Sequence, residues 1–404
     1  MAFTLLKTSK KTKARLGILK TAHGQIQTPF FMPIATKGSV KALRSEDVKK
    51  LGAEIILANT YHLFFKPGQR ILKKAGGIHG LMDWAGPVLT DSGGYQVFSL
   101  GGHKDYPSTL KLRRAGGGVA KPLVKITEQG AEFRSVYDGS KHLFTPKKVL
   151  KIQTDINSDI RMILDVCSPS KCSHAQAEKD LNITLRWAKI SQTAHVGAQD
   201  VALGRWKSKY LLFGIVQGSL FKDLRLKSVE ELIKMDFDGY AVGGLAVGES
   251  MREMYQVLDY AAPALPADKP RYLMGVGYPE QIAESVKRGI DMFDCVIPTR
   301  EARHGRLYLW TKQPKARLSA AGVFKKGKSF YKTVNITSAK FAEDFTSINA
   351  KSKIPELRNY TKAYLRHLFS AGEPLALRLA TLNNVEFYLD LMAKIRQAIK
   401  AGRL

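Results

Sequence analysis

Three aspartates stand directly after short apolar runs: Asp91 after VLT, Asp165 after MIL and Asp294 after MF. A carboxylate beside a buried run is costly to desolvate unless it is paired or hydrogen-bonded. Helix capping would explain any one of the three, because aspartate often caps the helix that follows a strand. Alternatively, paired carboxylates could exchange the group on a sugar carbon, one attacking C1′ as nucleophile while another moves a proton.

Polar and aromatic residues follow other apolar runs. Tyr95 in TDSGGYQVFS offers a ring on which a base could stack, and the glycines before it let backbone approach a ligand closely. The amide of Gln217 in VQGS can both donate to and accept from a purine edge. The loop GGLAVGE (243–249) supplies backbone donors and acceptors. A core or rim aromatic, a solvent-facing turn glutamine and plain turn glycines are the ordinary alternatives.

Cationic and sulfur-bearing residues are less informative. Arg300 and Arg303 in PTREARHGR suit phosphate groups, although a charged surface helix would look the same. The chain has three cysteines, too few for a disulfide framework or a four-cysteine zinc site. We expect Cys167 and Cys295 to be small buried apolar residues.

The elements that must position these residues alternate along the chain. Apolar runs suited to strands buried on both faces cover 54–59, 88–90, 161–165, 211–218, 239–244, 271–277 and 291–296. Helix-like segments lie between them, such as 174–191 with its three-to-four apolar spacing. Each run ends in a polar residue or glycine, which favours a (β/α)8 TIM barrel with its site at the carboxyl ends of the strands. Phosphate-loop glycine motifs, which would favour a nucleotide-binding sheet, are missing after these runs.

The composition of the chain limits the classes of protein to which it can belong. The chain has 404 residues with 64 Lys+Arg against 35 Asp+Glu, a net charge of +29, and its 44% hydrophobic content excludes wholesale disorder. It has no apolar run long enough for a membrane span and no secretory signal at its start, so we expect a cytoplasmic protein. Nine Lys/Arg and no acid precede Glu46, and eight Lys/Arg and no acid lie between 311 and 340. Such blocks indicate a polyanionic partner, the alternative being a solubility adaptation.

Three regions are expected along the chain. Residues 1–305 would form the barrel with N-terminal β elements, 306–368 a small basic insertion subdomain, and 369–404 C-terminal helices that complete the barrel. The glycine-rich and basic segment 101–122 is predicted to be a loop near the barrel mouth. Charge reversal at Lys325, Lys326 and Lys328 should lower the salt dependence of polyanion binding if the second basic block contacts phosphates.

Several long strings together resemble one family. LANTYHL (57–63), LTDSGGYQVFSL (89–100), LFGIVQGS (212–219), FDGYAVGGLAVGE (237–249), RYLMGVGYPE (271–280) and GIDMFDCVIPTR (289–300) are similar to motifs of bacterial-type tRNA-guanine transglycosylases. The resemblance covers nearly the whole chain. It implies a TIM barrel with an insertion near its last unit, and a homodimer. It also implies exchange of guanine at the first anticodon position of GUN-type tRNAs for a 7-deazaguanine base, in queuosine biosynthesis.

The resemblance also implies a role for each candidate residue. Asp294 would be the nucleophile and Asp91 the acid/base. The residues that would read the hydrogen-bonding edge of the base are Asp165, Gln217, Gly244 and Leu245. Tyr95 and Met274 would sandwich the base, and Arg300 and Arg303 would contact tRNA. Val247 and Cys167 resemble the bacterial pattern, which implies 7-aminomethyl-7-deazaguanine rather than queuine as the incoming base.

The sequence departs from the family in two places. Members carry a CxCxxC run and a later histidine that bind structural zinc, whereas the corresponding segment here retains His367 and no cysteine. Because structural zinc needs four ligands, we expect no metal and no other cofactor. The family's DEC reads Asp165-Val166-Cys167 here. A non-catalytic tRNA-binding paralogue and an enzyme acting on another nucleic acid are the alternatives, but a paralogue of that kind would be expected to lose Asp91 and Asp294.

Overall fold

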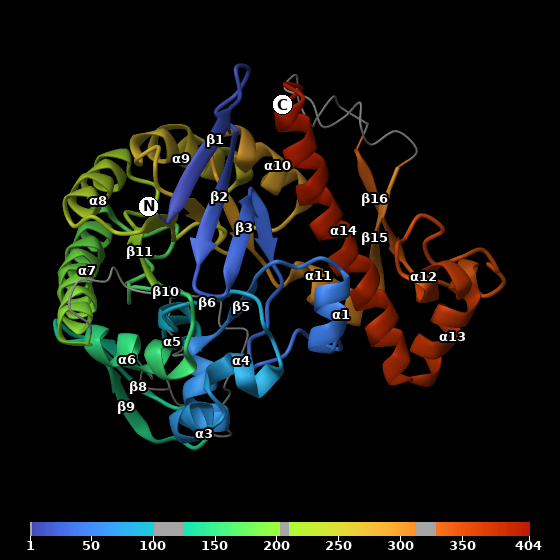
Figure 1. Cartoon of the computed structure of the whole chain (residues 1–404), viewed down its shortest axis with the longest axis horizontal. Coiled ribbons are helices and arrows are strands. Elements are labelled where there is room, and N and C mark those ends of the chain that lie inside the picture. Colours follow the sequence, from blue (N-terminus) through green and yellow to red (C-terminus); the bar gives the residue numbers. More distant parts are fainter. Residues whose placement is uncertain (1, 101–123, 203–209, 312–328) are drawn as a thin grey trace.

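Eight parallel strands form a closed barrel. The computed structural model describes residues 2–100, 124–202, 210–311 and 329–404. In order around the barrel, the strands are β4 (Phe30–Met32), β5 (Ile56–Ala58), β6 (Val88–Thr90), β10 (Ile160–Met162), β11 (Leu211–Val216), β12 (Gly239–Val242), β13 (Arg271–Leu273) and β14 (Met292–Asp294). β14 pairs with β4, and a parallel bridge between Ile34 and Leu57 joins β4 to β5. The predicted (β/α)8 TIM barrel is therefore confirmed (Figure 1).

Seven of these strands coincide with the apolar runs that the sequence indicates. Every residue of β11 is buried, as expected for a parallel strand covered on both faces. The eighth strand, β4, was not predicted. Its three residues lie between Pro29 and Pro33 and are too few to stand out as an apolar run.

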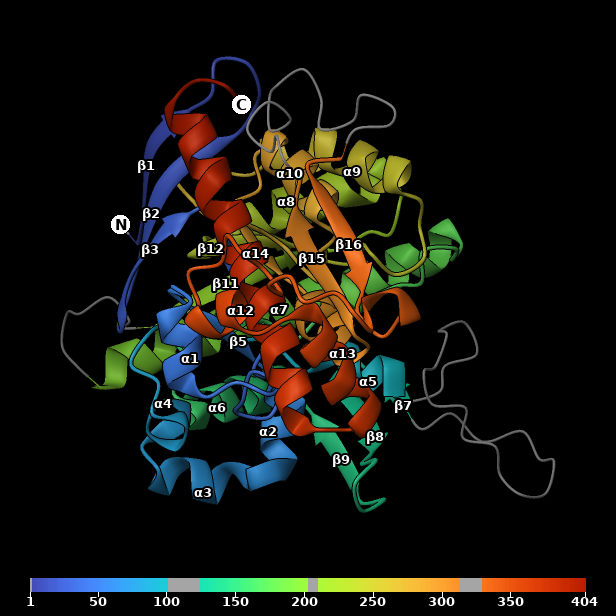
Figure 2. The same cartoon turned by 90° about the vertical axis from the view of Figure 1, so that its right-hand side faces the viewer.

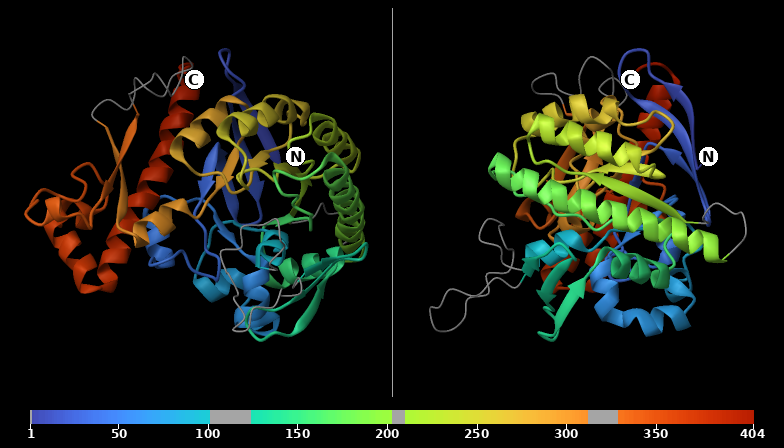
Figure 3. Two further views of the ribbon diagram at one scale, coloured as in Figure 1. Left: turned by 180° about the vertical axis from the view of Figure 1, so that it is seen from behind. Right: turned by 90° about the vertical axis from the view of Figure 1, so that its left-hand side faces the viewer.

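Helices cover the outside of the barrel. α7 (His174–Ala202), α8 (Lys222–Lys234), α9 (Met251–Ala264) and α10 (Pro279–Lys287) each follow a strand and lie side by side (Figure 3). The long helix α14 (Pro374–Lys400) packs against β4 and against α11 (Ile297–Arg303), so the end of the chain covers the junction of the first and last strands.

Three smaller units surround the barrel. The antiparallel strands β1 (Phe3–Thr8), β2 (Arg15–Thr21) and β3 (Gly24–Thr28) lie at the amino ends of the barrel strands, where buried Arg15 pairs with Asp291 just before β14. The connections after β4 and β5 contain short helical elements: α1 (Ser45–Lys50) after β4, and α2 (Thr60–Leu63), η1 (Phe64–Gly68), α3 (Gln69–Lys74) and α4 (Gly77–Met82) after β5. The connection after β6 contains helix α5 (Gly94–Leu100), a small antiparallel sheet and helix α6 (Pro146–Ile156). The strands of this sheet are β7 (Val124–Ile126), β8 (Ala131–Arg134) and β9 (Lys141–Phe144).

The insertion follows α11. Its elements are β15 (Arg306–Trp310), β16 (Tyr331–Asn335), η3 (Ala339–Phe341), α12 (Pro355–Asn359) and α13 (Lys362–Ala371), and they lie against α14 on one side of the barrel (Figures 1 and 2). Residue 368, where we place the end of the insertion, falls inside α13. The region boundaries stay predictions. The loop 101–122 and residues Lys325, Lys326 and Lys328 lie outside the described residues.

None of the helices in the described part of the chain combines the length and apolar character needed to cross a bilayer.

Candidate active site

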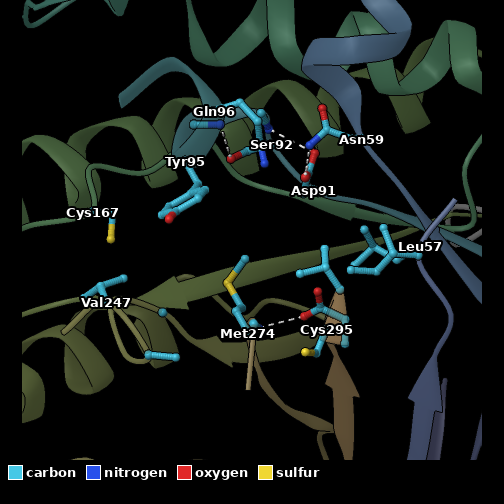
Figure 4. Close-up of a pocket in the computed structure, with 18 of the residues that line it drawn as sticks. Leu57, Asn59, Asp91, Ser92, Tyr95, Gln96, Cys167, Val247, Met274 and Cys295 are labelled. Carbon is cyan, nitrogen blue, oxygen red and sulfur yellow. Dashed lines mark hydrogen bonds between the residues drawn. The ribbon is translucent and has the colours of Figure 1, made fainter. Parts of the chain in front are cut away.

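The carboxyl ends of the barrel strands surround one cavity of about 480 Å³ (Figure 4). Its size lies within the range typical of small-molecule sites. Nine of the ten predicted site residues line it: Asp91, Tyr95, Asp165, Gln217, Gly244, Leu245, Met274, Asp294 and Arg300. Val247 and Cys167 line it as well. The structure thus brings together groups that are up to about 210 residues apart in the chain.

Asp91 is held by groups at the end of the neighbouring strand β5. The Asn59 side-chain amide donates to Oδ2 (2.5 Å), and the backbone N–H of Thr60 donates to Oδ1 (3.0 Å). The N–H of Gly93 also donates to Oδ1 (3.2 Å). Thr60 is the first residue of α2, so Asp91 accepts a hydrogen bond from a helix N-terminus. The capping interpretation is thus correct in kind, but the helix concerned follows β5 and not Asp91's own strand.

Asp294 is the last residue of β14, and its carboxylate is bound from β13. The Tyr272 hydroxyl donates to Oδ1 (2.5 Å) and the Gly275 N–H donates to the same oxygen (2.8 Å). Helix capping does not account for Asp294, because both donors belong to another strand and its following turn.

Burial raises the pKa values of both carboxyl groups. Burial, helped by the nearby Asp294 charge and opposed by the hydrogen bonds to the carboxylate, raises the pKa of Asp91 to about 7. Burial also raises the pKa of Asp294, opposed by the hydrogen bonds from Tyr272 and Gly275. An acid with a pKa near neutrality beside a second carboxylate is the arrangement that general acid–base catalysis requires.

Asp165 forms a second polar cluster with residues from two adjacent strands. The Gln217 Nε2 donates to Asp165 Oδ2 (2.7 Å) and the Ser92 hydroxyl donates to Oδ1 (3.3 Å). Burial raises the pKa of Asp165 to about 6, although these hydrogen bonds lower it. The remaining amide oxygen of Gln217 is buried and has no hydrogen-bond partner among the described residues, which leaves an acceptor unused at the cavity wall.

Apolar groups complete the cavity. Tyr95, on α5, is half exposed, and Met274 directly follows β13; both line the cavity and project into the open space between them (Figure 4). Gly243 and Gly244 approach Gln217 so closely that a Cβ on Gly244 would lie 2.5 Å from the Gln217 amide oxygen. These glycines therefore leave room that any other residue would fill.

The two arginines differ in position. Arg300 is exposed and lines the cavity. Both arginines belong to helix α11. Arg303 donates to the Thr299 carbonyl (3.1 Å) and is not among the residues that line the cavity. Only Arg300 is therefore placed at the mouth of the site by the structure.

Sequence reasoning assigned no role to two residues that hold the carboxylates. Asn59 follows an apolar run in the same way as Asp91, so its position was a usable signal. Tyr272 lies inside the run RYLMGVG, where nothing in the sequence separates it from an ordinary core tyrosine.

The insertion does not provide a donor set for structural zinc. His367 is exposed on α13, and the segment around it has no cysteine. Within the described residues, the one cluster of three candidate ligands is His23, His79 and Asp159, at the opposite end of the barrel. The residues present do not fit the zinc site of the family, and the absence of a cofactor stays a prediction.

A (β/α)8 barrel with two carboxylates on one cavity is the arrangement of enzymes that displace the group on a sugar carbon. A family profile described as queuine tRNA-ribosyltransferase matches residues 9–404. The chain is 46% identical over 402 residues to a protein of Caldanaerobacter subterraneus subsp. tengcongensis named queuine tRNA-ribosyltransferase, covering 100% of this chain and 94% of the relative. Proteins of the same name from Ruminiclostridium cellulolyticum (45%; 100% and 95% covered) and Nitratidesulfovibrio vulgaris (47%; 96% and 91% covered) are similar too.

The chain belongs to the queuine tRNA-ribosyltransferase family, the tRNA-guanine transglycosylases of queuosine biosynthesis. The resemblance inferred from the sequence motifs is therefore confirmed, and with it the assignment as a transferase.

Proposed function

We propose that this enzyme replaces guanine at the first anticodon position of GUN-type tRNAs by 7-aminomethyl-7-deazaguanine, through a covalent aspartyl–ribose intermediate, in the cytoplasm. The observation that carries the proposal is the pair Asp91 and Asp294 on one cavity, with Asp91 as the group whose pKa is raised to about 7. The family membership supports tRNA as the partner.

The two carboxylates take different roles in two displacements. Both hydrogen bonds to Asp294 use Oδ1, which leaves Oδ2 to attack C1′. As the O–C1′ bond forms, the bond from C1′ to N9 of guanine breaks, and Asp91 gives its proton to the departing base. The incoming base then loses its N9 proton to Asp91, and N9 attacks C1′ to release the Asp294 carboxylate. The configuration at C1′ is retained because it inverts twice.

The polar cluster beside the carboxylates suits the edge of a guanine-like base. Gln217 has a free amide oxygen, and Asp165 offers carboxylate oxygens for N–H groups of the base. Tyr95 and Met274 provide apolar surfaces for its two faces. The cavity also includes Val247 and Cys167, which support the small aminomethyl substituent on the incoming base.

Labelled guanine tests this function. The wild-type enzyme should incorporate the label into a matching tRNA and into its anticodon stem-loop, but not into DNA. Asp294→Asn should abolish incorporation, whereas Asp259→Asn, at an exposed position on α9, should not change it. Incorporation into DNA alone, or an unchanged kcat in Asp294→Asn, would contradict the proposal. Binding of tRNA with no exchange by the wild type would indicate the non-catalytic alternative.

We also propose a homodimer. On the insertion, Phe345 is 75% exposed and lies near two further exposed aromatic residues, Tyr360 and Tyr364, whose rings are 5.1 Å apart. Exposed aromatic clusters of this kind mark protein interfaces. Light scattering should give twice the chain mass for the wild type and a lower mass for Phe345→Ser with Tyr364→Ser; a wild-type monomer at micromolar concentration would contradict the dimer.

A further inference from the structure

Arg225 on α8 is a fully buried cation that lies directly behind the cavity. Its guanidinium donates only to backbone carbonyls: Nε to Ser219 (2.7 Å), Nη1 to Val216 and Gly243 (2.8 Å each), and Nη2 to Gly244 (3.4 Å). Among the described residues it forms no ion pair, and the one carboxylate that acts on it electrostatically is that of Glu249. Burying a charge without a counter-ion is costly, so the position calls for a role other than stability.

The four carbonyls belong to the end of β11 with its following turn and to the turn after β12, and both segments contribute residues to the cavity wall. Val216 and Ser219 flank Gln217, and Gly243 and Gly244 line the cavity beyond β12. The turns are packed against each other without space for side chains, since a Cβ on Gly243 would lie 2.8 Å from the Gln217 amide nitrogen. Arg225 therefore joins the two segments through its side chain, in addition to the backbone hydrogen bond from the Gly243 N–H to the Val216 carbonyl (3.1 Å).

The contacts also fix the direction of two peptide groups. In a trans peptide the carbonyl and the following N–H point in opposite directions. Because the carbonyls of Gly243 and Gly244 point to Arg225, the N–H groups of Gly244 and Leu245 point away from it. No acceptor among the described residues takes a hydrogen bond from either N–H. Two free donors are thus presented beside Gln217, whose amide oxygen is a free acceptor.

We propose that Arg225 is a positioning residue that holds the peptides 243–245 and the Gln217 turn in the orientation that binds the base. It does not touch the base or the ribose. Loss of the Arg225 side chain should weaken binding of the free base. At saturating base, the displacement at C1′ should proceed nearly as fast as in the wild type, because it depends on Asp91 and Asp294. This inference rests on base exchange as the proposed function.

Lysine is the sharpest substitution, because Arg225→Lys keeps the charge but cannot bind carbonyls of both turns in the planar geometry of arginine. Arg271→Lys is the matched control: Arg271 is also buried and donates to the Leu265 carbonyl (2.6 Å), but it lies at the start of β13, away from the cavity. With purified enzyme, tRNA and labelled guanine, Arg225→Lys should raise KM for guanine about tenfold with kcat within about threefold of wild type. Arg271→Lys should lower the melting temperature with KM unchanged.

Several outcomes decide the inference. An unchanged KM for guanine in Arg225→Lys, or a loss of kcat with KM constant, would overturn it. If Arg225→Lys does not fold, the fallback variant is Arg225→Gln, whose affinity for guanine is measured by calorimetry at low temperature. This variant should bind guanine more weakly than the wild type. An affinity equal to that of the wild type would overturn the inference as well. Failure of the wild type to exchange guanine at all would refute the proposed function instead, so the two failures are distinguishable.

Discussion

At the scale of single residues, the chemistry depends on how the surroundings of two carboxylates differ. Asp91 receives its hydrogen bonds from one amide side chain and two backbone N–H groups, and Asp294 from a tyrosine hydroxyl and a backbone N–H. The pKa of Asp91 is raised to about 7, so near neutral pH it can both give and take a proton.

The first half-reaction should therefore lose rate as pH rises above about 7, because Asp91 must be protonated to release guanine. The Asn59 amide lowers the pKa of Asp91, so Asn59→Ser, which keeps a helix-capping hydroxyl, should move this alkaline limb to higher pH. Single-turnover formation of the RNA adduct across pH measures it. Thr60→Val is the control, because the Thr60 hydroxyl donates to the main-chain carbonyl of Asp91 and not to its carboxylate. A limb that stays in place or moves to lower pH in Asn59→Ser would contradict the assignment.

Tyr272→Phe should affect the other carboxylate. Without the hydroxyl, the ionised form of Asp294 loses a donor and its pKa rises further, so the acid limb of the rate profile moves to higher pH. A hydrogen bond to a charged group is worth about 1.5–3 kcal/mol, and kcat should fall about 10- to 100-fold. Tyr388→Phe is the matched control, since that buried hydroxyl donates to the Gly277 carbonyl (2.6 Å). Equal acid limbs in the two variants would refute a role for Tyr272 through Asp294.

The sequence was sufficient for residues at strand ends and insufficient for residues inside strands. Asp91, Gln217 and Asp294 interrupt apolar patterns, so their positions drew attention. Tyr272 and Arg225 continue ordinary strand and helix patterns, and only the barrel geometry shows that one reaches Asp294 and the other reaches four carbonyls.

At the scale of elements, the insertion is the part whose stabilisation differs from what the family resemblance implies. Its core contains the fully buried Leu357 and Ile348. It is joined to α14 by hydrogen bonds from Asn349 to the Asn383 side chain (3.1 Å) and from Ser352 to Glu386 (2.5 Å). Apolar packing and polar contacts between protein groups thus hold this segment.

We therefore expect chelators to leave the melting temperature unchanged and elemental analysis to find no stoichiometric zinc. Leu357→Ala should lower the free energy of unfolding by about 2–4 kcal/mol, because it leaves a cavity in this small core. Denaturant titration measures the loss. A melting temperature that falls on chelation, with zinc bound at one equivalent per chain, would contradict the prediction.

Among the elements, the long apolar runs were predictable and the short or half-exposed strands were not. β11 has six consecutive buried residues, whereas β4 has three, and β7 to β9 alternate or mix exposure over three or four residues each. Short segments of this kind acquire their structure from pairing partners distant in the chain, which a single sequence does not display.

At the scale of the whole molecule, the net charge of +29 matters for the encounter with tRNA. Counterion release makes the logarithm of the binding constant fall with the logarithm of salt, by about 0.9 per phosphate contact for duplexes and about 0.7 for single strands. Arg300, at the cavity mouth, is placed to make one such contact.

Arg300→Ala should reduce the slope of this salt dependence by about one. The control is Arg403→Ala, at an exposed position near the amino ends of the barrel strands. Filter binding of tRNA between about 50 and 200 mM salt gives both slopes. If the two variants have equal slopes, Arg300 makes no phosphate contact.

The proposed reaction requires that Asp294 becomes bonded to the ribose of tRNA. The most direct measurement is to mix enzyme and tRNA without an incoming base, quench under denaturing conditions, digest the adduct and locate the modified residue by mass spectrometry. We expect an ester at the peptide that contains Asp294, which is lost in Asp294→Asn. An adduct at a different residue, or exchange that proceeds with no adduct at any time, would contradict it.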